Sequence, residues 1–244
     1  MADAFLSVEG LKRDFGGVRA VDLTLEVKKG ELRCLIGPNG AGKSTFFRML
    51  TGMLEPSAGS IRFQGREIRQ LDAFHVARLG ISIKFQVPSL FEQLTVLQNL
   101  HLAAEFRFGL AAGLERAHRM LDRIGFSDVA DELVMSLSHG QKQRLEIALA
   151  TIAEPELVLL DEPTAGVSPE EVNRTVDLVR DLTKHSTVIV VEHNMEFVRR
   201  IAHKVTVMHE GRLFAEGTMA EIEAHAGVRD IYLGRRSDDH ATGR

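Results

Sequence analysis

The feature that most constrains the fold of this 244-residue chain is the stretch "GPNGAGKST", residues 37–45. It follows the apolar run "LRCLI" and precedes the helical pattern "STFFRMLTG". Glycines at this spacing before Lys and Ser, between a strand and a helix, are typical of a phosphate-binding loop. Because the motif lies between a predicted strand and a predicted helix, the sequence predicts a strand–loop–helix unit that binds phosphates.

The residue types in this loop each suit a part of that chemistry. Gly37, Gly40 and Gly42 let backbone N–H groups curl around the phosphates. Lys43 supplies a positive charge to the outer phosphates, and the hydroxyl of Ser44 suits Mg²⁺. The predicted nucleotide-binding residues of the loop are Gly37, Pro38, Asn39, Gly40, Ala41, Gly42, Lys43, Ser44 and Thr45.

The order of apolar segments predicts the rest of an α/β fold. Short β-branched or apolar runs alternate with helical patterns, which is typical of a mainly parallel sheet flanked by helices. Strands are expected at 5–10, 23–27, 32–37, 60–65, 81–86, 157–162, 187–193, 204–211 and 212–217. Between Val87 and Ser136 the alternation stops, and two segments carry apolar residues at helical spacing, the second ending at Gly125. An all-helical insertion is expected there.

Composition and net charge limit the classes to which the protein could belong. Hydrophobic residues make up 44% and charged residues 26% of the chain, so disorder is expected only in the polar tail 235–244. A net charge of -4 gives no general attraction to polyanions and argues against nucleic acid as a partner. The single cysteine, Cys34, is expected to be a buried strand residue in a reducing compartment. No apolar run approaches the roughly 18 residues that cross a bilayer, and no signal segment is visible, so a cytoplasmic location is expected.

Two carboxylates end the apolar segment "LVLLDEP", residues 157–163. Successive strand residues point to opposite sides, so Asp161 and Glu162 are expected to have different roles at the strand tip. Asp161 would hold the metal, and Glu162 would face the water that attacks the γ-phosphate.

Other polar side chains also stand at segment ends. His193 ends an apolar strand pattern, where parallel α/β sheets gather their ligand sites, and Gln86 ends another and could reach Mg²⁺ or the water. In "LSHGQKQRLEIALA", residues 137–150, Ser138 and Gln141 fit a capping box before an apolar helical stripe. A helix N-terminus is also an anion site, so the segment could bind a phosphate.

Taken together, these motifs resemble the nucleotide-binding subunits of ABC transporters, in order and approximate spacing, from Leu6 to about Gly234. The resemblance implies a single P-loop ATPase domain over 1–234, with an antiparallel β portion at the N-terminus and a helical subdomain at about 87–145 inserted in a RecA-like core. It also implies ATP and Mg²⁺ as ligands and ATP hydrolysis as the activity.

The resemblance implies a role for each matching residue. Phe15 would stack on adenine, Gln86 would be the Q-loop residue and a metal ligand, Glu162 the general base and His193 the switch histidine, with Lys43 also catalytic. The family's signature motif corresponds to Ser138, His139, Gly140 and Gln141. Of these, Ser138, Gly140 and Gln141 would contact the γ-phosphate of an ATP held by a second subunit. Metal ligands would be Ser44, Gln86 and Asp161.

Two departures from the family pattern stand out. His139 occupies a position where most of the family has glycine. The segment "AGVSP", residues 165–169, replaces the usual D-loop sequence, with Ser168 where an aspartate is expected. The second departure concerns the loop through which the two nucleotide sites of a dimer would communicate.

Further motifs indicate which branch of the ABC transporter family the chain resembles. "FGGVRAVD", "GISIKFQVPSLFEQLTVLQNL" and the ending "VRDIYLGR" look like the ATPases of branched-chain amino acid and urea or amide uptake systems. The pairing of "ELRC" with "LSHGQKQ" and "KFQ" looks most like the urea-type members. This implies an importer subunit, peripheral on the cytoplasmic face of the inner membrane. Its partners would be a second ATPase subunit in a head-to-tail dimer, membrane permease subunits and, indirectly, a solute-binding protein.

Three alternatives remain beside import. An export or lipid-extraction ATPase of the same branch is opposed by the segment "IKFQVPSLFEQLTV". A soluble ABC ATPase acting on ribosomes or DNA would usually carry two cassettes or a long coiled-coil insertion. This chain has one cassette and an insertion of only roughly 50 residues, which opposes that alternative. A structural protein without activity is opposed by the presence of Lys43, Asp161, Glu162 and His193.

Overall fold

The computed structural model describes residues 4–84 and 90–233, so the expected Q-loop residue Gln86 and the polar tail 235–244 lie outside the described residues. The chain divides into two compact units. One comprises Met1–Leu79 together with Ile189–Arg244, and the other comprises Gly80–Val188.

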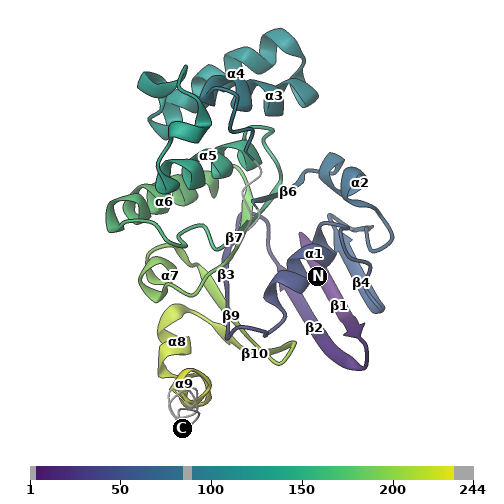
Figure 1. The fold of residues 1–244 in the computed structure, drawn as a ribbon. Coiled ribbons are helices and arrows are strands. Elements are labelled where there is room, and N and C mark those ends of the chain that lie inside the picture. The colour runs from purple at the N-terminus through teal and green to yellow at the C-terminus, as the bar shows by residue number, and fades with distance from the viewer. Residues whose placement is uncertain (1–3, 85–89, 234–244) are drawn as a thin grey trace. The chain divides into compact units, whose positions relative to one another are not determined.

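The first unit contains an antiparallel sheet near the N-terminus (Figure 1, purple and blue). Its strand order is β2-β1-β4-β5, from β1 (Leu6–Phe15), β2 (Val18–Val27), β4 (Ala58–Phe63) and β5 (Arg66–Glu67). β1 and β2 form a hairpin whose two turn residues, Gly16 and Gly17, both have positive φ. A two-residue turn of this kind matches the twist of the paired strands, which is why glycines stand there.

The first unit also contains strands whose residues are mostly buried. All five residues of β3 (Leu32–Ile36) are buried, including Cys34 as predicted, and β3 pairs in parallel with β9 (Lys204–His209). Burial raises the pKa of the Cys34 thiol well above its usual range, and the nearby charge of Glu192 adds to the effect. β10 (Arg212–Gly217) pairs antiparallel with β9. The helices of this unit are α1 (Lys43–Leu50), α2 (Ala73–Arg78), α7 (Met195–Ile201), α8 (Met219–Ala224) and α9 (Ala226–Leu233).

A charged side chain lies among these apolar strands. Arg33 is fully buried in β3, yet its guanidinium donates to the carboxylates of Glu31 and Glu216, the hydroxyl of Thr206 and the carbonyl oxygen of Glu26. A buried charge is tolerated when it is paired and hydrogen-bonded, and here each of the three guanidinium nitrogens donates at least one hydrogen bond. The strand formed by "LRCLI" therefore contains a buried ion-pair cluster, although its other residues are apolar.

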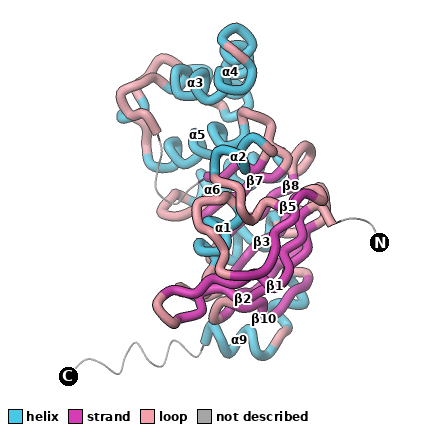
Figure 2. Tube along the Cα trace, turned by 90° about the vertical axis from the view of Figure 1, so that its right-hand side faces the viewer, coloured by secondary structure: helices cyan, strands magenta, loops and turns pink. Residues whose placement is uncertain are grey.

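The second unit joins a parallel strand pair to helices. β6 (Ile81–Lys84) pairs in parallel with β7 (Leu157–Asp161), and β8 (Thr187–Val191) crosses from this unit into the first. Helices α3 (Val96–Phe108) and α4 (Leu110–Ile124) lie side by side (Figures 1 and 2), followed by the single-turn 3-10 segments Ser127–Val129 and Val134–Ser136. Helices α5 (His139–Thr151) and α6 (Pro169–Leu182) complete the unit.

These elements confirm the predicted α/β fold and the predicted helical segment after Val87. α4 ends where the sequence predicts, because Gly125 adopts the left-handed conformation that closes a helix. Among the described residues, no helix is long and apolar enough to span a membrane.

Candidate nucleotide-binding site

The loop from Gly37 to Gly42 connects β3 to α1 in the first unit, and two of its glycines are required by close packing. A Cβ on Gly37 would lie 2.1 Å from the carbonyl oxygen of Met208, and a Cβ on Gly42 would lie 2.4 Å from that of Ala20. Gly40 has open space around it but a φ of +80°, which L side chains rarely adopt. The three glycines therefore allow a tight loop that lies directly on neighbouring backbone.

A glycine stands at the N-terminus of α1. Gly42 precedes the helix and has no side chain that could cap it. The ammonium of Lys43 donates to the carbonyl oxygens of Gly37 at 2.7 Å and Pro38 at 3.1 Å, so it lies over the loop. A helix N-terminus without a capping side chain, the helix dipole and a nearby lysine are features that favour an anion.

The turn between β9 and β10 is hydrogen-bonded to the loop of residues 37–42. The N–H of Gly211, between β9 and β10, donates to the carbonyl oxygen of Ala41 at 3.1 Å, and the N–H of Asp22 donates to that of Gly211 at 2.7 Å. A Cβ on Gly211 would lie 2.7 Å from the carbonyl oxygen of Ala20. This contact was not predicted from the sequence, in which the glycine of "HEGR" is the one signal for it.

Phe15 ends β1 and is 45% exposed. The guanidinium of Arg13 lies 4.6 Å from the centre of the Phe15 ring. An exposed aromatic face already in contact with a planar cation is suited to stacking on a base.

His193 follows β8 in a turn organised by its neighbours. The carboxylate of Glu192, itself 1% exposed, accepts the N–H groups of His193 at 2.9 Å and Asn194 at 3.1 Å. Asn194 then caps α7 by accepting the N–H groups of Glu196 and Phe197. The imidazole of His193 is exposed on a turn whose backbone is fixed from inside the unit.

In the second unit, Asp161 and Glu162 leave β7 in different ways. Asp161 is the last strand residue and is 7% exposed, whereas Glu162 lies beyond the strand with a φ of +48°. A left-handed non-glycine residue stores strain and is a feature of functional turns. The turn, rather than the alternation on which the sequence argument relied, therefore sets the direction of Glu162.

A buried ion pair that was not predicted from the sequence lies next to Asp161. Lys84 and Glu146 are 2% and 6% exposed, and their charged atoms are 3.7 Å apart. The ammonium of Lys84 also donates to the carbonyl oxygen of Asp161 at 3.3 Å. A lysine at the end of the strand "ISIK" is the signal that could have identified it.

The predicted capping box at Ser138 is present. The hydroxyl of Ser138 accepts the N–H of Gln141 at 3.3 Å, and the amide oxygen of Gln141 accepts the N–H of Ser138 at 2.9 Å. Within the described part of the chain, the N–H groups of His139 and Gly140 have no hydrogen-bond acceptor. The box therefore caps the helix and still leaves two N–H groups for an anion.

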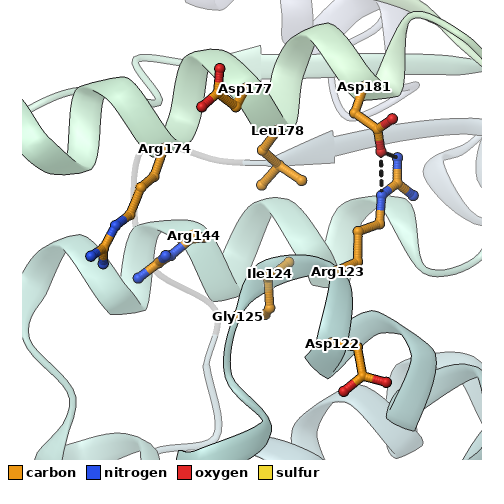
Figure 3. A pocket seen from close by; sticks show the side chains of 9 residues that line it. All are labelled: Asp122, Arg123, Ile124, Gly125, Arg144, Arg174, Asp177, Leu178 and Asp181. Atoms are coloured by element: carbon orange, nitrogen blue, oxygen red, sulfur yellow. Dashed lines mark hydrogen bonds and ion pairs between the residues drawn. The ribbon is translucent and has the colours of Figure 1, made fainter.

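A cavity of about 520 Å³ lies between α4, α5 and α6 (Figure 3). It is lined by Asp122, Arg123, Ile124, Gly125, Arg144, Arg174, Asp177, Leu178 and Asp181. Arg123 and Asp181 form an ion pair within it, as the dashed lines show. Acidic and basic side chains balance, so the lining favours neither anions nor cations.

Along the chain, the glycine-rich loop before α1, the two carboxylates at the end of β7 and the capped N-terminus of α5 are features of the class of ABC ATPases. A family model described as "ABC transporter" matches residues 20–165, and the chain belongs to this family. The protein is accordingly a nucleotide-binding ATP hydrolase of the ABC type.

Curated relatives and solved structures agree with this assignment. The high-affinity branched-chain amino acid transport ATP-binding protein LivG of Salmonella typhimurium is 36% identical, over 96% of this chain and 99% of the relative. BraF of Pseudomonas aeruginosa, which carries the same description, is 35% identical with the same coverage. The ADP conformation of an ATP-binding cassette of an ABC transporter superposes with a TM-score of 0.86 at 29% identity, over 96% of this chain and 100% of that chain.

Proposed function

We propose that this chain is the ATP-hydrolysing subunit of an ABC importer that takes up a small polar solute through a separate permease. The observation that carries the proposal is the N-terminus of α1, where the preceding Gly42 has no side chain to cap the helix and the ammonium of Lys43 lies over the glycine-lined loop. ATP phosphates supply the charge that this arrangement stabilises.

In this proposal the carboxylates of Asp161 and Glu162 have different roles in ATP hydrolysis. Asp161 and the hydroxyl of Ser44 are oxygen ligands of the kind Mg²⁺ prefers, and Gln86 completes the expected set. No cluster of three or more His, Cys, Asp or Glu side chains occurs among the described residues, so protein ligands to Mg²⁺ would be few and nucleotide phosphates would supply others. Mg²⁺ would neutralise charge on the β- and γ-phosphates. Glu162 orients the attacking water and accepts its proton.

The proposed assembly is a head-to-tail dimer with an identical or related ATPase subunit. The N–H groups of His139 and Gly140, left open by the capping box, would meet the γ-phosphate held by the partner's phosphate loop. Each ATP would then lie between the loop of one subunit and α5 of the other.

The helical segment offers a surface for the permease. Leu102, Phe106, Leu110 and Leu114 on α3 and α4 are exposed, with Phe106 exposing 79% of its area. Clustered exposed apolar side chains mark interaction sites. Docking there would place the subunit peripherally on the cytoplasmic face of the inner membrane.

The relatives and the sequence motifs favour two solutes. The names of LivG and BraF favour branched-chain amino acids, whereas the motifs "ELRC", "KFQ" and "LSHGQKQ" favour urea or a short amide. Deleting the coding sequence in the source organism and measuring uptake of labelled leucine and labelled urea separates these solutes. Loss of one uptake activity, restored by the wild-type chain but not by Lys43→Ala, identifies the solute. Unchanged uptake of both solutes and of other branched-chain amino acids and short amides contradicts import.

A further inference from the structure

The first residue of α5 contacts the turn that follows β7 within the same unit. The Nε2 atom of His139 lies 3.1 Å from the carbonyl oxygen of Ala165. A carbonyl only accepts, so Nε2 carries the hydrogen and donates it. A Cβ on Gly166 would lie 3.4 Å from the same nitrogen, so the imidazole also occupies the space beside the next residue of the turn.

Ala165 in turn is connected to Glu162. The N–H of Ala165 donates to the carbonyl oxygen of Glu162 at 3.3 Å, which closes the turn in which Glu162 has a φ of +48°. Ala165 therefore makes one backbone hydrogen bond to Glu162 and accepts another from His139. Through Ala165, the position of the strained carboxylate residue is linked to the N-terminus of α5.

A second set of contacts fixes α5 against α6. One carboxylate oxygen of Glu171 accepts from Arg144 on α5 at 3.3 Å and from Arg174 on α6 at 3.0 Å. Figure 3 shows these two arginines reaching from the facing helices toward the same side of the cavity. A Cβ on Gly140 would lie 2.5 Å from Cγ of Glu171, so only glycine permits this approach. Because the helices are held here, the His139 contact is not needed to hold them together.

We propose that His139 is a positioning residue that ties the Glu162 turn to the N-terminus of α5. When that N-terminus engages the nucleotide of the partner subunit, His139 sets the position of Glu162 in its own chain. This inference rests on the proposed function, which assigns Glu162 as the base and α5 as the contact to the partner's nucleotide. It gives a joint role to the two departures from the family pattern, at His139 and at residues 165–169.

The expected effect is on turnover rather than on nucleotide affinity. His139 is exposed, so its removal leaves the carbonyl group of Ala165 hydrated and the fold intact. Loss of one such hydrogen bond should lower kcat about three- to tenfold, with KM for ATP within about twofold of wild type. The amide nitrogen of glutamine can replace Nε2 as a donor, so His139→Gln should recover most of kcat.

The test compares His139→Ala, His139→Gln and His101→Ala in the full chain, by steady-state ATP hydrolysis and by thermal unfolding. His101 is the matched control, because its Nε2 atom lies 3.0 Å from the carbonyl oxygen of Leu110 in a similar contact elsewhere in the unit. We expect lower kcat only in His139→Ala, with Tm unchanged. Equal kcat for His139→Ala and wild type, equal loss in His139→Ala and His139→Gln, or a fall in kcat explained by a lower Tm overturns the inference.

One further variant separates this inference from the proposed function. If Glu162→Gln hydrolyses ATP at the wild-type rate, the assignment of Glu162 fails, and the inference about His139 fails with it. If Glu162→Gln is inactive while His139→Ala retains full turnover, the proposed function stands and only the positioning role of His139 is wrong.

Discussion

The ammonium of Lys43 donates to the carbonyl oxygen of Gly37 at 2.7 Å, across the loop that the two residues bound. Bound phosphates would compete with this carbonyl for the lysine. Lys43→Ala should lower ATP affinity at least about tenfold, because a charge-assisted contact to the phosphates contributes roughly 1.5 to 3 kcal/mol. Calorimetric titration with ATP measures the change. Lys28→Ala, at an exposed lysine before β3, is the control and should bind as wild type does.

Glu162→Gln should bind ATP normally and lose most turnover. The amide cannot accept the proton of the attacking water, so we expect a fall in kcat of at least about 10²-fold. Glu170→Gln, at an exposed glutamate in the first turn of α6, should keep full activity. Wild-type turnover in Glu162→Gln would remove this residue from its assigned role.

Mixing two inactive variants tests whether each nucleotide is shared between subunits. Lys43→Ala and Ser138→Arg homodimers should each be nearly inactive. In the mixed dimer both lesions fall in one site, and the other site combines an intact phosphate loop with an intact α5 N-terminus. ATPase activity should therefore return in part.

If α5 served the nucleotide of its own chain, every site in the mixture would carry a lesion and no activity would return. With a related ATPase as the obligate partner, the Ser138-type lesion is placed in that partner instead. Lesions in the same site are then compared with lesions in opposite sites, and equal activity for both arrangements contradicts a shared site.

Base discrimination should be weak, because a stacking contact does not read the hydrogen-bonding edge of the base. We expect GTP to compete with ATP within about tenfold, and Phe15→Ala to weaken both by a similar factor, consistent with the ~1 to 3 kcal/mol of aromatic stacking. Phe74→Ala is a matched control, since Phe74 is also an exposed phenylalanine with an arginine beside its ring. A thousandfold preference for ATP would mean that another group reads the base.

The Arg33 cluster should make stability depend on pH on the acid side. Burial alone would raise the pKa of Glu216, but the hydrogen bond from Lys204 and the charge of Arg33 outweigh burial and hold that pKa below its ordinary value of 4.5. A carboxyl whose pKa is lowered by folding stabilises the fold above its unfolded pKa, and that contribution is lost as pH falls through the folded pKa.

Glu216→Gln should therefore lower Tm at pH 7 and lose less Tm than wild type between pH 5 and 3. Thermal unfolding across this range measures both effects. Glu223→Gln serves as the control, because it removes a half-exposed ion pair to Arg199. Parallel acid profiles for wild type and Glu216→Gln would contradict the role given to Glu216.

Motifs with local physical causes were predictable from the sequence. The loop at residues 37–45, the capping box of Ser138 and Gln141 and the helix stop at Gly125 each depend on a few adjacent residues, and the structure has all three. Contacts between distant segments were not predictable. Lys84 and Glu146 are 62 positions apart in the chain, and neither residue type predicts burial on its own.

The same limit applies to the turn after β7. Hydrophobic periodicity places Asp161 at the end of the strand, but it contains no information on the left-handed backbone of Glu162. Nor does any local pattern pair His139 with Ala165, because that contact depends on how α5 packs near the turn.

The contact of Gly211 with Ala41 has a consequence for the order in which the protein matures. Synthesis proceeds from the N-terminus, so the phosphate loop leaves the ribosome about 170 residues before the turn that holds it. At typical synthesis rates of ~5 to 20 residues per second, that interval lasts on the order of ten seconds or more. During this time the nascent chain contains the complete loop sequence without its final support, and high-affinity nucleotide binding should begin only after β9 and β10 have been made.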